Sequence, residues 1–361
     1  MRDGKIFARG AIDDKGPTMA AFYGLKIVKE LGLPLQKNVR IIFGTDEESG
    51  MSCMRHYKEV GEMPKVGFAP DADFPIIHAE KGQINTKIGL PTSDTQHEES
   101  DLELVSIVSG DRINMVPEQA TAVVRGNLGR IQDEFVAFCQ EQGVQQSSNQ
   151  KGDEMELIIL GKAAHGMEPQ IGVNAGTTLA TFLKTYKFEP NTKRFIEFLS
   201  DLHKDFEGKD LGIAYQDEIT GPLTVNPGVI HVDSEDSYVR LNIRCPVTTD
   251  YDEIIGKLKK SIDDKELMIE ELRQSRPHHV DGDDSFIQAL QKAYKDETGM
   301  EPTLLSTGGG TYARFMEKGV AYGASFPGKE MTAHQKDEYI EVEDLLKATA
   351  IYARAIYEMA R

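Results

Sequence analysis

The spacing of hydrophobic residues near the start of the chain predicts an alternation of helices and buried strands. Small and apolar residues recur at helical spacing over residues 15–31, which predicts an amphipathic helix that ends before Gly32 and Pro34. Residues 39–44 and 66–70 are short apolar runs that predict two buried strands, and acidic residues follow each of them at once. The carboxyl ends of parallel strands meet at one edge of a sheet. The pattern therefore predicts a parallel sheet with a site at that edge.

The pattern changes after about Gly82, where alternating and helical segments are mixed. Strands are predicted at 84–88, 102–108, 121–125, 157–160 and 238–243, and helices at 133–142 and 175–186. The α/β alternation returns with helices at 285–297 and 342–359 and strands at 303–305 and 320–325. We therefore expect one domain built from residues 1–80 and 281–361, interrupted by an α+β domain of residues 81–280.

Length and charge narrow the function classes. The chain has 361 residues with 41 Lys and Arg against 59 Asp and Glu, a net charge of −18. This length favours two domains, and the negative charge argues against a nucleic-acid partner. No apolar run approaches the roughly 18 residues of a membrane span, and the first residues lack the apolar segment of a signal peptide. Three scattered cysteines fit a reducing compartment, so a cytoplasmic location is predicted.

Acidic residues at the predicted strand ends are the strongest candidates for chemistry. Glu47 and Glu48 follow the first strand, Asp71 follows the second, and Asp13 precedes the first helix. Adjacent glutamates point in different directions, so one can bind a metal while the other acts as a general base. Each acidic segment also has a simpler interpretation when it is taken alone. The two glutamates could lie in a solvated loop, Asp13 and Asp14 could cap a helix, and Asp71 could lie in a turn.

Two histidines lie in sequence settings that favour chemistry. His165 lies among small residues in the sequence GKAAHG, and His334 follows the glycine-rich stretch of Gly308, Gly309 and Gly310. Such glycines let the backbone approach a ligand closely, and no Gly-Lys-Ser/Thr sequence follows to make a phosphate loop. The remaining histidines are predicted to be structural (His78, His231) or on the surface (His56, His97, His203, His278, His279). Carboxylates and histidine without a redox motif suit zinc, so the residues favour a metal-dependent hydrolase.

The order of five motifs resembles a known family over essentially the whole chain. The motifs are ARGAIDDKGP at 8–17, GTDEES at 44–49, APDADFP at 69–75, GGGTYAR at 308–314 and AHQ at 333–335. They are similar to those of the dizinc aminoacylase/carboxypeptidase superfamily, and within it to bacterial cytosolic dipeptidases of the dipeptidase V type, including carnosinase-like Xaa-His enzymes. The resemblance implies an α/β zinc-peptidase catalytic domain of the phosphorylase/hydrolase-like type. Its sheet is mostly parallel, and an α+β lid domain interrupts it.

The resemblance also implies roles for the acidic residues and His334. Asp13 would bridge two zinc ions, Glu48 and His334 would complete the ligands of one ion, and Asp71 would bind the other. Glu47 would be the general base that deprotonates the water held between the metals. The predicted function is therefore a dipeptidase that cleaves the peptide bond of dipeptides with a zinc-activated water.

Three further sites are implied in the same way. His165 would reach from the lid to stabilise the tetrahedral oxyanion, with Asn114 nearby. Arg244 would clamp the free carboxylate of the dipeptide, a bidentate task that suits a guanidinium. Gly308, Gly309 and Gly310 would line the path of the substrate.

One departure from the family pattern concerns the second zinc. Family members carry a His-x-Asp motif upstream of the residue that matches Asp13, and the twelve residues before Asp13 here do not contain it. We therefore expect an N-terminally truncated relative that binds one zinc well and a second one weakly. Two alternatives stay open: a truncated pseudo-enzyme that binds metal or peptide without turnover, and an N-acyl amino acid deacylase. The oligomeric state is not predicted.

Overall fold

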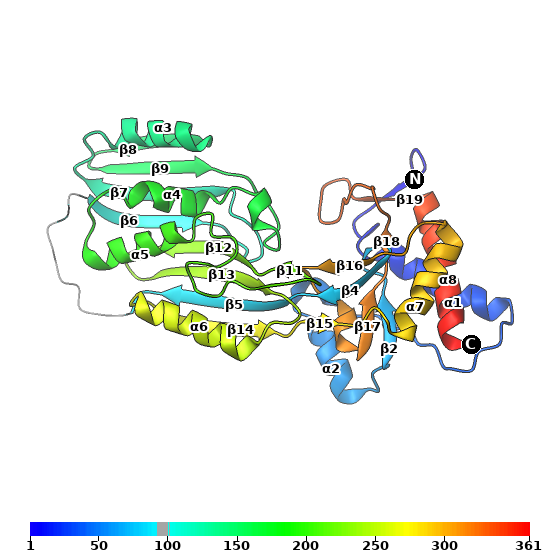
Figure 1. Ribbon diagram of the computed structural model, residues 1–361. Coiled ribbons are helices and arrows are strands. Elements are labelled where there is room, and N and C mark those ends of the chain that lie inside the picture. Colours follow the sequence, from blue (N-terminus) through cyan, green and yellow to red (C-terminus); the bar gives the residue numbers. More distant parts are fainter. Residues whose placement is uncertain (92–99, 101) are drawn as a thin grey trace. The chain divides into compact units, whose positions relative to one another are not determined.

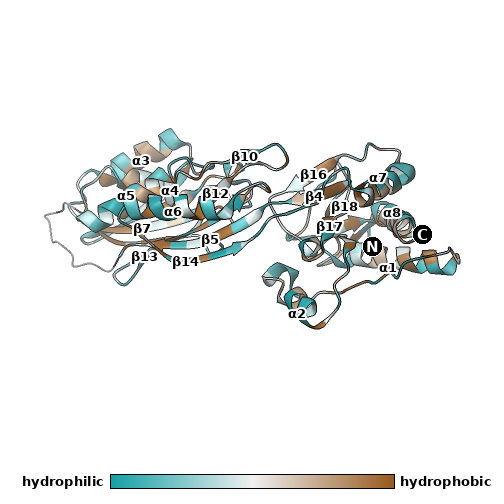
Figure 2. Ribbon diagram, turned by 60° about the horizontal axis from the view of Figure 1, so that its bottom comes forward, coloured by the Kyte–Doolittle hydropathy of each residue, from teal (hydrophilic) through white to brown (hydrophobic). Residues whose placement is uncertain are grey.

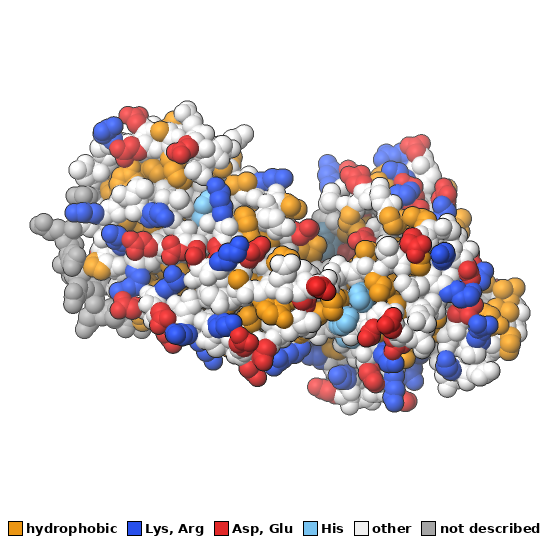
Figure 3. Space-filling model, in the orientation of Figure 1, with side chains coloured by type: hydrophobic (Ala, Val, Ile, Leu, Met, Phe, Trp, Pro, Cys, Tyr) orange, Lys and Arg blue, Asp and Glu red, His pale blue; other side chains and the backbone are white. Residues whose placement is uncertain are grey.

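The computed structural model describes residues 1–91, 100 and 102–361, so His97 lies outside the described residues (Figure 1). The chain forms two compact units. The first unit comprises Met1–Lys81 and Pro277–Arg361, and the second comprises Gly82–Arg276. No described helix has the length and apolar character needed to cross a membrane. On the face shown in Figure 3, basic and acidic side chains are interspersed on both units, so the negative charge of the chain is not gathered into one patch there.

A five-stranded sheet forms the centre of the first unit. Its strands are β2 (Val66–Ala69), β4 (Ile76–Glu80), β15 (His278–His279), β16 (Leu304–Thr307) and β17 (Lys318–Ala321). The longer pairings, β16 with β4 and β17 with β2, are parallel. The shorter pairings of β4 with β15 and β17 are antiparallel. Two small sheets pair β1 (Lys5–Phe7) with β19 (Tyr339–Glu341) and β3 (Ala72–Asp73) with β18 (Ala324–Ser325).

Helices surround this sheet, and their apolar faces build its core. They are α1 (Lys15–Glu30), α2 (Ser52–Val60), α7 (Ser285–Thr298) and α8 (Val342–Ala360), with short 3-10 turns at Glu47–Ser49 and Tyr312–Phe315. Helix α8 packs against both α1 and α7 (Figure 1). Phe74 is 1% exposed, and its ring centroid lies 5.1 Å from that of Tyr322 and 4.8 Å from that of Phe326. This aromatic cluster fixes the chain three residues after Asp71, which is a candidate ligand.

An antiparallel sheet of eight strands forms the second unit. In spatial order the strands are β14 (Met268–Ser275), β5 (Gly82–Gly89), β13 (Ser237–Cys245), β12 (Thr224–Val232), β6 (Leu102–Ser109), β7 (Gln119–Gly126), β9 (Glu154–Leu160) and β8 (Gln145–Lys151). The helices α3 (Ile131–Gln142), α4 (Ala175–Leu183), α5 (Pro190–Asp201) and α6 (Tyr251–Asp264) lie along one face of this sheet (Figure 2). A 3-10 turn at Pro169–Ile171 and a small hairpin of β10 (Gln216–Asp217) and β11 (Gly221–Pro222) complete the unit. Its core is one continuous apolar cluster between the sheet and the helices.

Three predictions made from local pattern are wrong. Residues 39–44 form no strand: Phe43 is 63% exposed, and no described strand pairs with the backbone of this segment. An apolar run becomes a strand only when a neighbour satisfies its N–H and C=O groups. His203 and His278 are half-buried rather than on the surface, since the ring of His203 contacts Thr177 Oγ1 and that of His278 contacts the Gly319 carbonyl.

The contact between α1 and α8 depends on the absence of a side chain at Gly24. A Cβ atom there would lie 2.9 Å from the backbone nitrogen of Ala353 in α8. Alanine ordinarily stabilises a helix relative to glycine. We nevertheless expect Gly24→Ala to destabilise the protein by about 1–3 kcal/mol, because the two helices must move apart. Thermal and urea unfolding followed by circular dichroism measure this, with Lys29→Ala on the same helix as the control. A stabilised Gly24→Ala variant would contradict this packing.

Candidate metal centre

One buried glutamate holds the loop that carries Asp13. The carboxylate of Glu338 is 3% exposed and accepts hydrogen bonds from the backbone N–H groups of Gly10 (2.8 Å), Ile12 (3.0 Å) and Asp13 (3.1 Å). Burial acts to raise the pKa of Glu338, but these three donors outweigh it, and the pKa lies below its ordinary value. Glu338 is therefore ionised, and its hydrogen bonds fix the backbone at Asp13.

A second set of backbone contacts fixes the turn that carries Glu47 and Glu48. The carboxylate of Asp46 accepts the backbone N–H groups of Ser52 (2.7 Å) and Cys53 (3.0 Å), which begin helix α2. The backbone N–H of Asp46 donates to the hydroxyl of Tyr312 at 3.2 Å. The turn bearing the two glutamates is thereby tied both to α2 and to the chain that follows the three glycines.

Asp13, Glu48 and His334 come together although they lie far apart in the sequence. His334 Nε2 lies 2.7 Å from Asp13 Oδ2 and also contacts the carboxylate of Glu48. One potential ligand atom from each residue lies within 4.8 Å of the other two. His334 adopts the left-handed backbone region with φ of 61°, which few residues other than glycine visit and which is found often at functional sites. The loops thus present two carboxylates and an imidazole to one point.

Further carboxyl groups surround these three ligands, and burial together with mutual repulsion raises their pKa values. Burial first, and then the charge of Glu48, raises the pKa of Glu47 to about 7. Burial first, and then the charge of Glu47, raises the pKa of Asp71 to about 8. Burial first, and then the charge of Asp71, raises the pKa of Asp14 to about 9. A site that packs so many acidic groups favours a bound cation, which stabilises their ionised forms.

The donor set fits zinc. Two carboxylates and one imidazole are ligands that zinc commonly binds, and three protein ligands leave a position open for water or substrate. Asp14 Oδ1 is buried and accepts no hydrogen bond from any described residue, which is costly unless a positive charge lies nearby. Within the described part of the chain, Asp13, Glu48 and His334 form the one group of three or more potential ligands that converges in this way. These residues would hold the metal, with Asp71 beside them.

Glycines at 308–310 follow strand β16 in the same unit. A Cβ atom on Gly310 would lie 2.6 Å from a terminal nitrogen of Arg314, so glycine here makes room for that guanidinium. Arg314 in turn pairs with the buried Glu80, with Nε lying 3.2 Å from Oε2. The glycine stretch therefore lies beside a buried ion pair, and Glu80 is one of the charges that raise the pKa of Glu47.

The remaining predicted site residues, Asn114, His165 and Arg244, lie in the second unit. The loops of Asn114 and His165 touch: the backbone N–H of Gly166 donates to the carbonyl of Asn114 at 2.7 Å. His165 Nδ1 accepts the backbone N–H of Met167 at 3.3 Å. A neutral imidazole that accepts at Nδ1 carries its proton on Nε2, the form suited to donate to an oxyanion. Arg244 is 3% exposed.

Sequence reasoning did not identify Glu338, Glu80 or the role of Asp14. Glu338 lies in the polar sequence QKDEY, which looks like a solvated loop, and Glu80 ends an apolar strand without belonging to any motif. The second aspartate of the Asp13-Asp14 pair was a usable signal, because paired acidic residues before a helix can do more than cap it.

Residues 1–358 match the sequence profile of peptidase family M20/M25/M40. The chain belongs to this family. The predicted superfamily and the prediction of a peptidase, and so of a hydrolase, are confirmed. The comparisons support the predicted metal-dependent dipeptidase, and not the pseudo-enzyme or deacylase alternatives.

Relatives and solved structures agree with this family. The chain is 46% identical over 369 residues to a Bacillus subtilis protein named putative dipeptidase YtjP, covering 100% of this chain and 78% of that protein. It is 39% identical over 361 residues to SSP1012 of Staphylococcus saprophyticus, which carries the same designation, covering 99% and 77%. Among solved structures, aminopeptidase PepT of Bacillus cereus matches with a TM-score of 0.53 at 15% identity, covering 100% of this chain and 76% of that one. The metallo-carboxypeptidase Sso-CP2 of Sulfolobus solfataricus also gives 0.53, at 14% identity and with coverage of 99% and 79%. These likenesses confirm the α/β fold class.

Removing the charge of Glu338 should weaken metal binding without removing a ligand. In Glu338→Gln, the side-chain amide would turn an NH₂ group toward backbone donors, so the Asp13 loop would shift. We expect zinc affinity to fall about 10- to 100-fold, measured by competition with a chelator of known affinity. Glu330→Gln, on the exposed loop before His334, serves as the control. An unchanged zinc affinity in Glu338→Gln would show that the Glu338 carboxylate does not position Asp13.

The raised pKa values predict how pH affects the metal-free protein. A carboxyl whose pKa rises on folding stabilises the folded state fully below its unfolded pKa, and that stability is lost as pH rises through its folded pKa. Because Glu47, Asp71 and Asp14 have pKa values of about 7, 8 and 9, the melting temperature of chelator-treated protein should fall between about pH 6 and about pH 8.5. Zinc should remove most of this fall, and Asp71→Asn should reduce it. A melting temperature that rises over this range without metal would refute the account.

Proposed function

We propose that this chain is a zinc-dependent dipeptidase whose metal lies between Asp13, Glu48 and His334. The convergence of these three ligands beside the partly buried carboxyl groups of Asp14, Glu47 and Asp71 is the observation that carries the proposal. The names of the relatives add a dipeptide as the substrate class. The three cysteines are scattered along the sequence, which supports a reducing compartment such as the cytoplasm.

In this proposal water cleaves the peptide bond, and a residue of the chain transfers the proton. A bound zinc ion supplies acidification of that water and polarisation of the scissile carbonyl. Glu47 lies next to a ligand in sequence but is free to act as a base. Its carboxylate takes the proton of the attacking water and passes it to the departing amine. Burial and the charge of Glu48 raise the pKa of Glu47 to about 7 in the metal-free protein. A bound cation favours the ionised carboxylate, which is the form that accepts a proton.

Residues of the second unit bind and polarise the substrate in this proposal. His165, with its proton on Nε2, donates to the tetrahedral oxyanion, and Asn114 assists from the adjoining loop. Arg244 binds the carboxylate of the dipeptide as a bidentate partner. The description of the first unit as a catalytic domain and of the second as a lid belongs to the same proposal, as does a path lined by Gly308, Gly309 and Gly310.

We further propose one strongly bound zinc per chain. The cluster of Asp13, Glu48 and His334 gives that ion three ligands, whereas among the described residues Asp71 and the shared Asp13 would give a second ion carboxylates alone. Two carboxylates should hold zinc more weakly than a site that includes an imidazole. Metal analysis of purified protein after dialysis measures the stoichiometry.

Replacing Glu47 and Glu48 separately tests the proposed division of roles. Glu47→Gln should lower kcat for dipeptide hydrolysis by at least about 100-fold, because the base is lost, while zinc content stays near that of the wild type. Glu48→Gln should lose both activity and zinc, because a ligand is lost. Steady-state kinetics and metal analysis on the same samples separate the two effects. Turnover by Glu47→Gln within about tenfold of the wild type would remove Glu47 from the reaction.

A further inference from the structure

A row of three asparagines crosses the sheet of the second unit. Asn85 of β5, Asn242 of β13 and Asn226 of β12 are direct partners in the strand register. Asn226 is 0% exposed and Asn242 is 1% exposed. Buried amide side chains are costly unless they are hydrogen-bonded. We infer that Asn226 and Asn242 are positioning residues, which hold Asn114, His165 and Arg244 in place for the substrate.

Asn226 holds the loop that presents Asn114. Its Nδ2 donates to the carbonyls of Ile113 and Met115, both at 2.9 Å. These two carbonyls lie on either side of Asn114, whose side chain is exposed. One buried amide group thus fixes the backbone immediately before and after this residue.

The same amide also supports the loop of His165. Met115 forms an isolated β-bridge with His165, and the carbonyl of Asn114 accepts the N–H of Gly166. A Cβ atom on Gly166 would lie 3.0 Å from Asn226 Nδ2, which shows how closely the two loops pack over this side chain. Because the loops contact each other there, a shift at Asn226 moves both Asn114 and His165.

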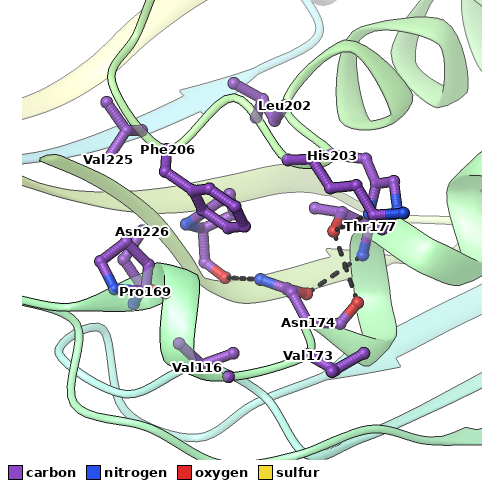
Figure 4. Close-up of a pocket in the computed structure, with 13 residues that line it drawn as sticks. Val116, Pro169, Val173, Asn174, Thr177, Leu202, His203, Phe206, Val225 and Asn226 are labelled. Atoms are coloured by element: carbon purple, nitrogen blue, oxygen red, sulfur yellow. Dashed lines mark hydrogen bonds between the residues drawn. The ribbon is translucent and has the colours of Figure 1, made fainter.

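Asn226 also lies at a pocket of the second unit. The pocket has about 430 Å³ of empty space, part of it open to solvent, and Asn226 and His203 both line it (Figure 4). Asn226 Oδ1 is buried and has no hydrogen-bond partner among the described residues. On the neighbouring wall, Asn174 Nδ2 donates to the carbonyl of Pro227 at 2.8 Å, which fixes the strand just after Asn226. Asn226 therefore acts on the loops through its donors.

Asn242 orients Arg244, two residues further along the same strand and face. Asn242 Oδ1 accepts Arg244 Nε at 2.7 Å, and Asn242 Nδ2 donates to Asn85 Oδ1 at 2.6 Å. The bond to Asn85 leaves Oδ1 of Asn242 turned toward the arginine. With Nε bound, the plane of the guanidinium is set, and that plane decides whether the group can engage a carboxylate with two hydrogen bonds.

The two asparagines should therefore affect different kinetic constants. This inference rests on the proposed function for the roles of the three groups that are held. Loss of the Asn226 donors should lower kcat, because the groups that act on the oxyanion are misplaced. Loss of the Asn242 acceptor should raise KM for dipeptides but not for their C-terminal amides, because only the former present a carboxylate.

Leucine has nearly the shape of asparagine without its polar atoms, so Asn226→Leu and Asn242→Leu are the variants to compare. Thr86→Val is the matched control, since it removes one buried hydrogen bond of the same sheet, from Thr86 Oγ1 to the Glu271 carbonyl at 2.8 Å. We expect Asn226→Leu to lower kcat about tenfold or more with little change in KM. Asn242→Leu should raise KM for the dipeptide about tenfold and leave the amide unaffected. Asn242→Asp keeps an oxygen that can accept Arg244 Nε, so its KM for the dipeptide should lie much closer to that of the wild type.

An equal rise in KM for the dipeptide and for its C-terminal amide in Asn242→Leu would overturn the inference, and so would the same kinetic effect in Thr86→Val. Either result would leave the asparagines with a structural role alone. Hydrogen exchange supplies a readout independent of turnover: Asn226→Leu should speed exchange at the Gly166 amide, and Asn242→Leu should not. If Asn226→Leu fails to fold, Asn226→Asp removes the same donors and takes its place. A zinc-loaded wild type that cleaves no dipeptide would refute the proposed function. In that case the exchange result alone decides whether Asn226 holds the loops, and unchanged exchange refutes it.

Discussion

Carboxylates that share a partly buried site repel one another, and the centre of the first unit depends on this repulsion being balanced. Burial and neighbouring charges raise the pKa values of Asp13, Asp14, Glu47 and Asp71 together. A protein gains nothing in stability from such a cluster by itself. The arrangement becomes favourable when a divalent cation occupies it, and this explains why a peptidase of this family concentrates acidic side chains on three separate loops.

Two other buried carboxylates have a different role, because the chain supplies their partners. Glu338 accepts three backbone N–H groups, and Glu80 accepts the N–H of Thr311 and pairs with Arg314. Neither needs a metal for its stability. They hold the loops of the centre in place, so the acidic cluster around Asp13 keeps its form while its own charges repel. In the second unit neutral groups have a similar role. The buried amide of Asn226 hydrogen-bonds the loop of Asn114, and that of Asn242 hydrogen-bonds Arg244.

The sequence predicts the periodic elements well and the precise site less well. Helix α1 and strand β2 form where local spacing predicts them, and Ala20 and Val28 of α1 and Ala69 of β2 are buried, although Ile27 and Val66 are exposed. Residues 39–44 have the same local signal and form no strand, because pairing depends on a neighbour that spacing cannot reveal. The grouping of Asp13, Glu48 and His334 came from the order of motifs, which encodes contacts between distant segments. Glu338 and Asn226 were missed because their importance lies in the backbone groups they meet. His203 was misplaced because the polar residues Asp201 and Lys204 near it in the sequence do not show that the fold places its ring against Thr177.

The most direct test of the central claim is a crystal structure of zinc-loaded protein with anomalous diffraction data collected on both sides of the zinc absorption edge. The account predicts a zinc peak within about 2.0–2.2 Å of one oxygen of Asp13, one oxygen of Glu48 and Nε2 of His334. Absence of zinc from this position in protein that retains peptidase activity, or a zinc ion bound by other residues while this position holds none, would contradict it.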